Sequence, residues 1–329
     1  MASHKFVTLM TTVVALASLA GCGKLPAVAP APVAAMDMTS NLPMPELSVF
    51  GKHEDEGITT VDSEIGKVTL GLIPDGHIPA DTPVYEKLAG KDRKLMSQAL
   101  PKAVDLREFV ADVRNQGNLG SCTSFSSSAL LEFYFRKKGQ TTPRMSPLFI
   151  YYTERSIMDA GQRSRGEKAR ALGMDTGGSS YLACYALTHF GACPESDMPY
   201  QDGKAALKVA PSEKAQADAQ KYRPTTMAQI KTIDGMKKAL SDGHAFILGM
   251  KIYKSFMTKA VARTGKMLTL GDREESVGGH SVMCVGYDDA KGAFIIRNSW
   301  GKDWGQDGYF EMPYEYVKPG KMYSCFTIL

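Results

Sequence analysis

Residues 115–139 read NQGNLGSCTSFSSSALLEFYFRKKG, and this stretch decides the fold because a glycine-rich loop runs directly into a helical pattern. From Cys122 to Lys138 apolar residues recur at helical spacing, and Gly139 is suited to end the helix. The pattern predicts a helix with Cys122 in its first turn. Free N–H groups and the helix dipole at that end favour a thiolate, the reactive form of cysteine. Taken alone, Cys122 is a nucleophile, half of a disulfide or a small buried residue.

A nucleophilic cysteine needs a histidine as general base and acid, and His280 is the best placed of the six histidines. It lies in VGGHSVMCVGY (277–287), at the start of an apolar strand and after two glycines that permit close backbone approach. A catalytic imidazole also needs an orienting partner. The next predicted strand, in IIRNSWGKDWG (295–305), ends at Asn298, and we expect Trp300 to shield that hydrogen bond from water. On its own, His280 also fits a histidine without a catalytic role.

Predicted helices fill residues 122–243, and predicted strands fill most of the chain after that. Further helices are expected from Ser146–Pro147, in GGSSYLACYALTHFG (177–191) and in MAQIKTIDGMKKALSDG (227–243). Strands are expected in AFILGMKIY (245–253), HSVMCVGYDD (280–289), GAFIIRNSW (292–300), GYFEMPY (308–314) and SCFTIL (324–329). Helices followed by strands, without βαβ alternation, predict an α+β domain with two halves and a cleft between them.

Over residues 101–329 the chain resembles the papain-like cysteine peptidases, in several separate blocks that follow the family order. VDLR (104–107) resembles the start of the mature enzyme and NQGNLGSC the nucleophile block. GGHSVMCVGYD (278–288) resembles the histidine block, and IIRNSWGKDWGQDGYF (295–310) the asparagine block. The resemblance implies a papain-like two-subdomain α+β fold. Its helical N-terminal half and antiparallel β-barrel-like C-terminal half would enclose the active-site cleft.

The resemblance also implies roles for individual residues. A catalytic triad and the side chain of the oxyanion hole are expected at Cys122, His280, Asn298 and Gln116. The Cys122 backbone N–H would be the second oxyanion donor. An extended peptide substrate would pair with the backbone at Gly177, Gly178 and Gly279.

Two positions depart from the family pattern. Leu119 stands where the family usually has a cysteine, which removes half of a familiar disulfide, and Thr123 replaces the usual aromatic residue after the nucleophile. QGNLGSCTS resembles a bacterial subgroup that commonly lacks the long inhibitory pro-region. The leading hypothesis is a cysteine endopeptidase. A non-catalytic binding or inhibitory module, motivated by Thr123, and a transpeptidase or cell-wall peptide hydrolase are the alternatives.

The N-terminal segment is expected to export and anchor the chain. Lys5 precedes the apolar run FVTLMTTVVALASLA (6–20), which is short for a membrane span and leads into LAGC (19–22). This pattern resembles a bacterial lipobox, which implies a signal peptide over 1–21 and acylation of Cys22. The alternative is an ordinary secretory signal with an incidental cysteine. The expected location is therefore the bacterial cell envelope, at the outer membrane or cell surface, through a lipid anchor.

Three segments follow the signal. Residues 22–48 are rich in Pro and Ala and are interpreted as a tether, residues 49–100 as a linker or short pro-segment, and residues 101–329 as the peptidase domain.

The composition excludes several other classes of protein. Among 329 residues, 43% are hydrophobic and 22% charged, as in soluble globular proteins, and a net charge of +4 gives no reason to expect a nucleic-acid partner. Histidines and cysteines lack metal-ligand spacing, so neither a metal nor another cofactor is expected. For the remaining cysteines, a disulfide and free thiols are both open; these are Cys184, Cys193, Cys284 and Cys325.

Overall fold

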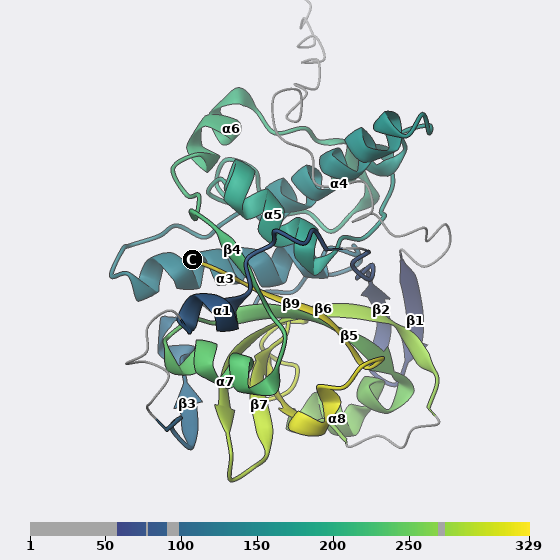
Figure 1. Ribbon diagram of the computed structural model, residues 1–329. Helices are drawn as coiled ribbons and strands as arrows, with labels where there is room; N and C mark the ends of the chain where they lie inside the picture. The colour runs from purple at the N-terminus through teal and green to yellow at the C-terminus, as the bar shows by residue number, and fades with distance from the viewer. Residues whose placement is uncertain (1–57, 77, 91–98, 269–273) are drawn as a thin grey trace, which may run out of the picture. The chain divides into compact units, whose positions relative to one another are not determined.

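The computed structural model describes residues 58–76, 78–90, 99–268 and 274–329. Its helices are α1 (Tyr85–Ala89), α3 (Cys122–Lys137), α4 (Pro147–Ser164), α5 (Ser180–Phe190), α6 (Glu213–Ala219), α7 (Ile233–Ser241) and α8 (Lys259–Thr264). Its strands are β1 (Thr59–Ser63), β2 (Gly66–Leu70), β3 (Ala103–Asp105), β4 (Met227–Ile230), β5 (Phe246–Tyr253), β6 (Ser276–Asp288), β7 (Ala293–Arg297), β8 (Tyr309–Pro313) and β9 (Met322–Ile328). The α+β class expected from the sequence is confirmed (Figure 1).

The helical half consists mainly of α3, α4 and α5, which pack against one another. Side-chain caps explain where two of them begin. Ser146 precedes Pro147 and its hydroxyl accepts from the Phe149 N–H at 3.0 Å, and Ser179 caps α5 in the same way at Leu182. The Ser146 cap and the apolar spacing were readable in the sequence, so these helices are found where they were predicted.

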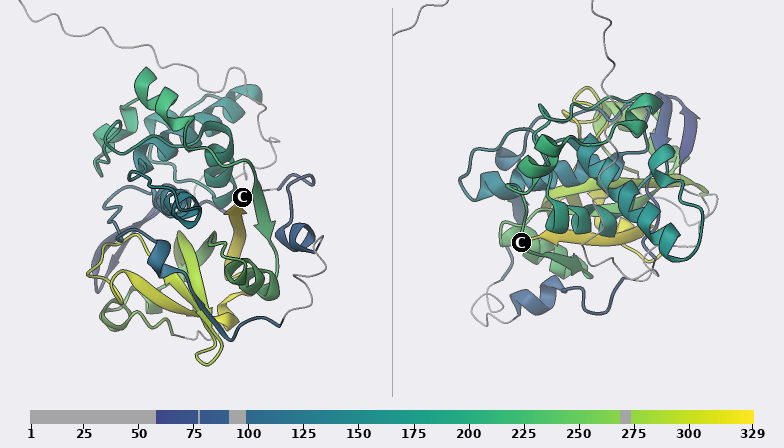
Figure 2. Two further views of the ribbon diagram at one scale, coloured as in Figure 1. Left: turned by 90° about the vertical axis from the view of Figure 1, so that its left-hand side faces the viewer. Right: turned by 90° about the horizontal axis from the view of Figure 1, so that it is seen from above.

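The other half is an antiparallel sheet in the strand order β4-β9-β5-β6-β7-β8, with β3 paired to the far end of β6. β6 is its central strand: Met250 of β5 lies opposite His280, and Met283 lies opposite Arg297 of β7. Within the described residues, the outer strands β4 and β8 do not pair with each other, so the sheet is open rather than a closed barrel. Figure 2 shows from two further directions that the helical half lies over the strands, whereas α7 and α8 lie beside them.

One other expectation needs correction. The segment 227–243 does not form one helix, because its first residues join the sheet as β4, opposite β9, and only Ile233–Ser241 is helical. Met227, Ala228 and Ile230 alternate poorly, and tertiary pairing with β9 decides their conformation. Within residues 49–100, interpreted as a linker or short pro-segment, the described residues 58–76 contain the hairpin β1–β2, which contacts β6 and leaves that interpretation untested.

α3 joins the two halves. Its residues from Cys122 to Phe133 are all buried, and it contacts α4, α5 and β6. The hydroxyls of Ser126 and Ser281 are 2.8 Å apart, one turn after Cys122 and one residue after His280. The packing of α3 on β6 therefore brings together the two sequence blocks expected to carry the chemistry.

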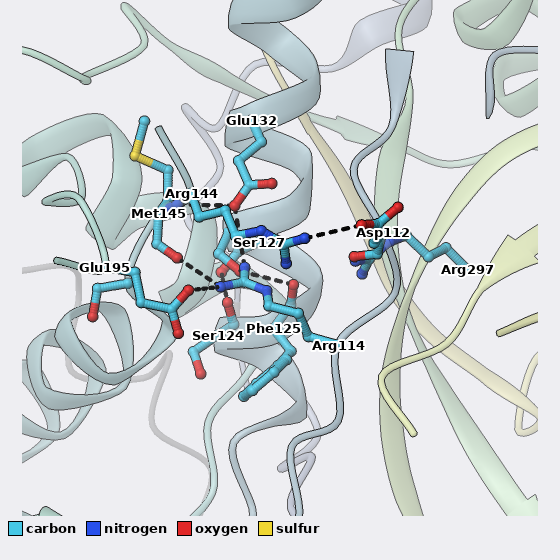
Figure 3. Close-up of polar contacts among 12 residues, drawn as sticks. Asp112, Arg114, Ser124, Phe125, Ser127, Glu132, Arg144, Met145, Glu195 and Arg297 are labelled. Carbon is cyan, nitrogen blue, oxygen red and sulfur yellow. Dashed lines mark hydrogen bonds and ion pairs between the residues drawn. The ribbon is translucent and has the colours of Figure 1, made fainter. Parts of the chain in front are cut away.

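A second set of contacts anchors the chain that leads into the nucleophile loop (Figure 3). Arg114 donates to Glu195 at 2.8 Å, to the Met145 carbonyl at 3.0 Å and to the Ser128 hydroxyl at 2.9 Å. It also pairs with the buried Glu132 at 3.2 Å. These bonds join the chain at Arg114 to α3 and to the segment after α5.

No helix in the described part of the chain is both long and apolar enough to cross a membrane. The predicted signal peptide, Cys22 and the tether lie outside the described residues.

Candidate active site

His280 and Asn298 lie side by side, one on β6 and the other directly after the adjacent strand β7. His280 is fully buried on β6, and its Nε2 is 2.8 Å from Oδ1 of Asn298, which directly follows β7. Because an amide oxygen accepts, Nε2 carries the proton and Nδ1 is the basic nitrogen. Nδ1 is buried and has no hydrogen-bond partner among the described residues. The Trp300 ring stacks on the imidazole at 4.8 Å between centroids, as expected for a residue that shields this bond.

Cys122 occupies the first turn of α3 and is fully buried. Burial raises the pKa of its thiol to about 11, although the backbone N–H groups of Ser281, Gly71 and Thr123 all favour the thiolate. Burial also lowers the pKa of His280 to about 4, against the opposing effect of the Asn298 bond. A neutral thiol and a neutral imidazole are therefore the favoured forms while the site is covered.

Gln116 is held in place from the asparagine block. Its Oε1 accepts from the Ser299 hydroxyl at 2.6 Å, and its backbone N–H donates to the Ser299 carbonyl at 2.9 Å. Its Nε2 faces the loop and donates to the Leu119 carbonyl at 3.0 Å and to the Thr69 carbonyl at 3.4 Å. Ser299 thus links the predicted oxyanion donor to the residue after Asn298, a role that the sequence alone did not reveal.

Residues 69–73 run through the site and cover it. The Gly178 N–H donates to the Gly71 carbonyl at 2.9 Å, and Ile73 donates back to the Gly178 carbonyl at 2.8 Å. On the opposite side, Leu72 donates to the Gly279 carbonyl at 3.2 Å. Two of the three glycines predicted to bind substrate backbone therefore bind this segment instead, and Leu72 runs parallel to Gly178.

The covering segment fits closely. A Cβ on Gly71 would lie 2.1 Å from the Gly120 carbonyl oxygen, so only glycine is accommodated there. The Leu72 side chain is 3% exposed and fills a slot whose floor is Gly249, where a Cβ would lie 2.7 Å from Leu72 Cδ2. The segment thus buries the Cys122 thiol, and no extended helical pro-region was needed for this.

Gly177, the third predicted substrate glycine, has a left-handed φ of +73°. Its N–H donates to the Tyr151 hydroxyl of α4 at 2.9 Å. Gly177 is therefore held by α4, whereas Gly178 pairs with the covering residues.

Thr123, the residue that departs from the family pattern, pairs with a buried carboxyl group. Its hydroxyl donates to Oε2 of Glu154 at 3.0 Å. Burial raises the Glu154 pKa to about 8, against the lowering effects of this hydrogen bond and of Arg155. A Cβ on Gly178 would lie 2.4 Å from Glu154 Oε1. Thr123 and Glu154 therefore occupy the space beneath Gly178.

Cys184, Cys193, Cys284 and Cys325 are all free and buried, so the structure decides against a disulfide among them. Within the described residues no group of His, Cys, Asp and Glu side chains is arranged to hold a metal.

Sequence reasoning missed Ser299, the covering segment and Tyr200. The Tyr200 hydroxyl donates to the Gln116 carbonyl and lies 2.7 Å from Ser121 Oγ. Ser299 was quoted in the asparagine block and adjoins Asn298, which was a usable signal. Nothing in the local sequence of Tyr200 or of residues 69–73 indicates contact with the loop.

Comparison with known proteins agrees with this geometry. The model of the papain family cysteine proteases matches residues 100–325. The chain belongs to the papain family of cysteine proteases, and its class of activity is peptide-bond hydrolysis.

Individual relatives support the same conclusion. An uncharacterized peptidase C1-like protein of Acanthamoeba polyphaga mimivirus is 31% identical over 262 residues, which cover 74% of this chain and 81% of that protein. Xylellain, a cysteine protease from Xylella fastidiosa, is 30% identical with a TM-score of 0.69, and the match covers 82% of this chain and 97% of that chain. A cysteine protease of Carica candamarcensis in complex with E-64 is 22% identical with a TM-score of 0.51, covering 70% and 98%, which shows the fold alone.

Proposed function

We propose that this peptidase is an endopeptidase that works through Cys122, His280 and Asn298 and is kept latent by its own residues 69–73. One observation carries the proposal. The helix that begins at Cys122 packs on the strand that carries His280, with the hydroxyls of Ser126 and Ser281 2.8 Å apart, while His280 Nε2 is bonded to Asn298. This packing supports a triad in which the imidazole of His280 acts between the Cys122 thiol and the Asn298 amide, as covalent catalysis requires.

The mechanism follows from these positions once the covering segment has left. His280 Nδ1 takes the proton of the Cys122 thiol, and the thiolate attacks the scissile carbonyl carbon. The resulting oxyanion is stabilised by Gln116 Nε2 and the Cys122 N–H, at roughly 3 kcal/mol per donor. The imidazolium then protonates the leaving amine, and water, deprotonated by His280, hydrolyses the thioester. Asn298 keeps Nε2 protonated throughout, so Nδ1 remains the nitrogen that exchanges protons.

Latency is supported by the contacts of the covering segment. The Thr69 carbonyl accepts from Nε2 of the predicted oxyanion donor Gln116 at 3.4 Å, and the Gly178 backbone pairs with residues 71 and 73. A substrate strand would use these same groups. The two occupants therefore exclude each other.

The anchor is part of the proposal and rests on the sequence alone. Residues 1–21 would be removed and Cys22 acylated, which would hold the enzyme at the bacterial envelope on the tether 22–48. Mass spectrometry of the mature N-terminus tests this, because an unacylated N-terminus upstream of Cys22 would refute it.

The cysteine-directed inhibitor E-64, bound in the Carica candamarcensis structure, tests the nucleophile. We expect one adduct on Cys122 in the full chain, formed slowly while residues 69–73 cover the site, and peptidase activity that disappears with the adduct. Failure of Cys122 to react, also after the cover is displaced, would favour the non-catalytic module and contradict the proposal.

Substrate profiling separates the remaining alternative. We expect the uncovered enzyme to cleave internal bonds of a peptide library. Exclusive action on peptidoglycan stem peptides, or transfer of the acyl group to an amine in preference to water, would assign the cell-wall hydrolase or transpeptidase reaction instead.

A further inference from the structure

We propose that Asp175 and Tyr151 are positioning residues that hold the nucleophile loop (Gly117–Ser121) and the Gly177–Gly178 segment in one geometry, by hydrogen bonds in place of a covalent link. The proposal rests on the proposed function, because it concerns how the same site is kept in register. Its starting point is Leu119, which stands where the family has a disulfide cysteine. All cysteines of the described residues are free.

Asp175 binds the nucleophile loop at the residue after Leu119. Its two carboxylate oxygens accept from the Gly120 backbone N–H at 3.2 and 3.1 Å. Gly120 directly precedes Ser121 and Cys122, so this bond lies at the entrance to the first turn of α3. Among the described residues, Asp175 is the sole hydrogen-bond acceptor for the Gly120 N–H.

Tyr151 links Asp175 to Gly177, next to the predicted substrate-binding residue Gly178. Its hydroxyl donates to Asp175 Oδ1 and accepts from the Gly177 N–H at 2.9 Å. Burial raises the pKa of Tyr151 well above its ordinary value, with a further rise from the Asp175 charge, so the hydroxyl keeps the proton that it donates. One unbroken series of hydrogen bonds thus joins Gly120 to Gly177, next to the glycine that pairs with an extended chain.

Tyr151 is itself rigidly placed. It is fully buried on α4, and the Arg155 guanidinium lies over its ring at 4.6 Å. Arg155 is fixed in turn by the carbonyls of Leu172 and Leu207, at 3.1 and 3.0 Å. The positive charge also faces the ring that adjoins Asp175. The hydrogen-bonded bridge from Gly120 through Asp175 and Tyr151 to Gly177 is therefore anchored on a buried, well-fixed side chain of α4.

The consequence for catalysis is geometric. Gly120 fixes where the Cys122 sulfur lies, and Gly177 fixes the Gly178 edge where a peptide would be held. A displacement of about 1 Å between nucleophile and substrate can cost roughly 100-fold in rate. Losing the bridge should therefore impair catalysis more than it impairs folding.

The test compares variants in the full chain carrying Leu72→Glu, which opens the covered site. We expect Asp175→Ala to lower kcat/KM by about 30-fold, mainly through kcat. Asp175→Asn keeps an acceptor oxygen for both the Gly120 N–H and the Tyr151 hydroxyl, so it should restore activity to within about threefold. Tyr151→Phe loses the contact to Gly177 as well and should also raise KM.

Asp159→Ala is the matched control. Asp159 lies on the same helix α4 and accepts from the backbone N–H groups of Ala171 and Leu172 at 2.5 and 3.3 Å, but it does not contact the nucleophile loop. We expect it to lower the melting temperature without lowering kcat. A second readout is the pH profile of Cys122 alkylation by iodoacetamide, which should change in Asp175→Ala and stay in place in the control.

The outcomes separate the two proposals. If the Leu72→Glu parent neither cleaves peptides nor reacts with E-64, the proposed function fails. If the parent is active but Asp175→Ala keeps its kcat/KM and alkylation profile, the positioning role is wrong. It is also wrong if Asp159→Ala loses as much kcat at equal thermal stability, because general loosening of residues 171–178 would then explain the effect.

Discussion

The two sides of the site are built in different ways. The histidine side places His280 on β6 and Asn298 directly after β7, and the pairing of these two strands brings the two side chains together. The cysteine side, formed by the loop 116–121 and the first turn of α3, has no such ladder. Side chains from distant segments hold it, among them Tyr200 and Asp175. The first side is determined by pairing register, the second by individual side-chain contacts.

This difference teaches where the site is sensitive to change. A sheet side resists single substitutions because each strand is held by many backbone bonds, whereas a loop side depends on a few acceptors. The following predictions sharpen or break this comparison, in order of decreasing effect.

Removal of the nucleophile defines the scale. Cys122→Ala should lower kcat by about 10⁴-fold or more and abolish the E-64 adduct, because no other group supplies the thiolate. Steady-state peptide hydrolysis and intact-mass analysis measure both effects. Cys193→Ala, which removes another free buried thiol, should keep full activity. Residual cleavage by Cys122→Ala at the wild-type rate would show that the cysteine side carries no chemistry.

The buried carboxyl beneath the cysteine side should make stability depend on pH. The folded-state pKa of Glu154 is raised to about 8 from 4.5. The stability that the protonated carboxyl contributes to the folded state is therefore fully present below about pH 4.5 and is lost as the pH rises through 8. At pH 9 this loss is on the order of 3–5 kcal/mol relative to pH 4. Urea unfolding at several pH values should therefore show a smaller decline in Glu154→Gln than in the wild type.

The control for this prediction is Glu167→Gln, which changes an exposed carboxylate whose pKa is lowered by Arg165 and should leave the decline from about pH 5 to 9 unaltered. Equal pH profiles for Glu154→Gln and the wild type would mean that Glu154 is ionised in the folded protein and that the cysteine side tolerates a buried charge.

Leu72 packs against Gly249 and Gly279 of the sheet, and the neighbouring Gly71 packs against Gly120 on the cysteine side. Leu72→Glu places a carboxylate in this slot, at a cost of several kcal/mol unless the segment leaves, so E-64 should react about 100-fold faster. Leu72→Met conserves the volume and should change the rate by less than about threefold. An unchanged rate in Leu72→Glu would show that residues 69–73 do not limit access to Cys122.

The smallest effect is expected at the link between the two sides. Ser299→Ala removes the hydroxyl that orients the Gln116 amide, so kcat should fall about 10-fold while the E-64 reaction of Cys122 changes little. Ser255→Ala, which removes a hydroxyl bonded to Glu274 instead, is the matched control. An equal loss in both variants would mean that Gln116 needs no orientation from the histidine side.

Much of this arrangement was predictable because it is encoded locally. The helix from Cys122, the Ser146 cap and the strands around His280 and Asn298 follow from periodicity and capping residues. The β4 strand was mistaken for helix because its four residues take their conformation from β9, about 100 residues later in the chain. The hydrogen bond between Asp175 and Gly120 was not predicted for the same reason, since the two residues are 55 positions apart.

The sequence by itself determined the chemistry on offer: one cysteine at a helix start, one histidine after two glycines, and one asparagine at the end of the following strand. It also determined the family, because these blocks occur in order over residues 100–325. Only the tertiary structure decided that residues 69–73 occupy the site and that Asp175, Tyr151, Tyr200 and Ser299 hold the loop. The reason is physical. Capping and periodicity act between residues a few positions apart, whereas burial and hydrogen bonding between distant segments exist only once the chain has folded.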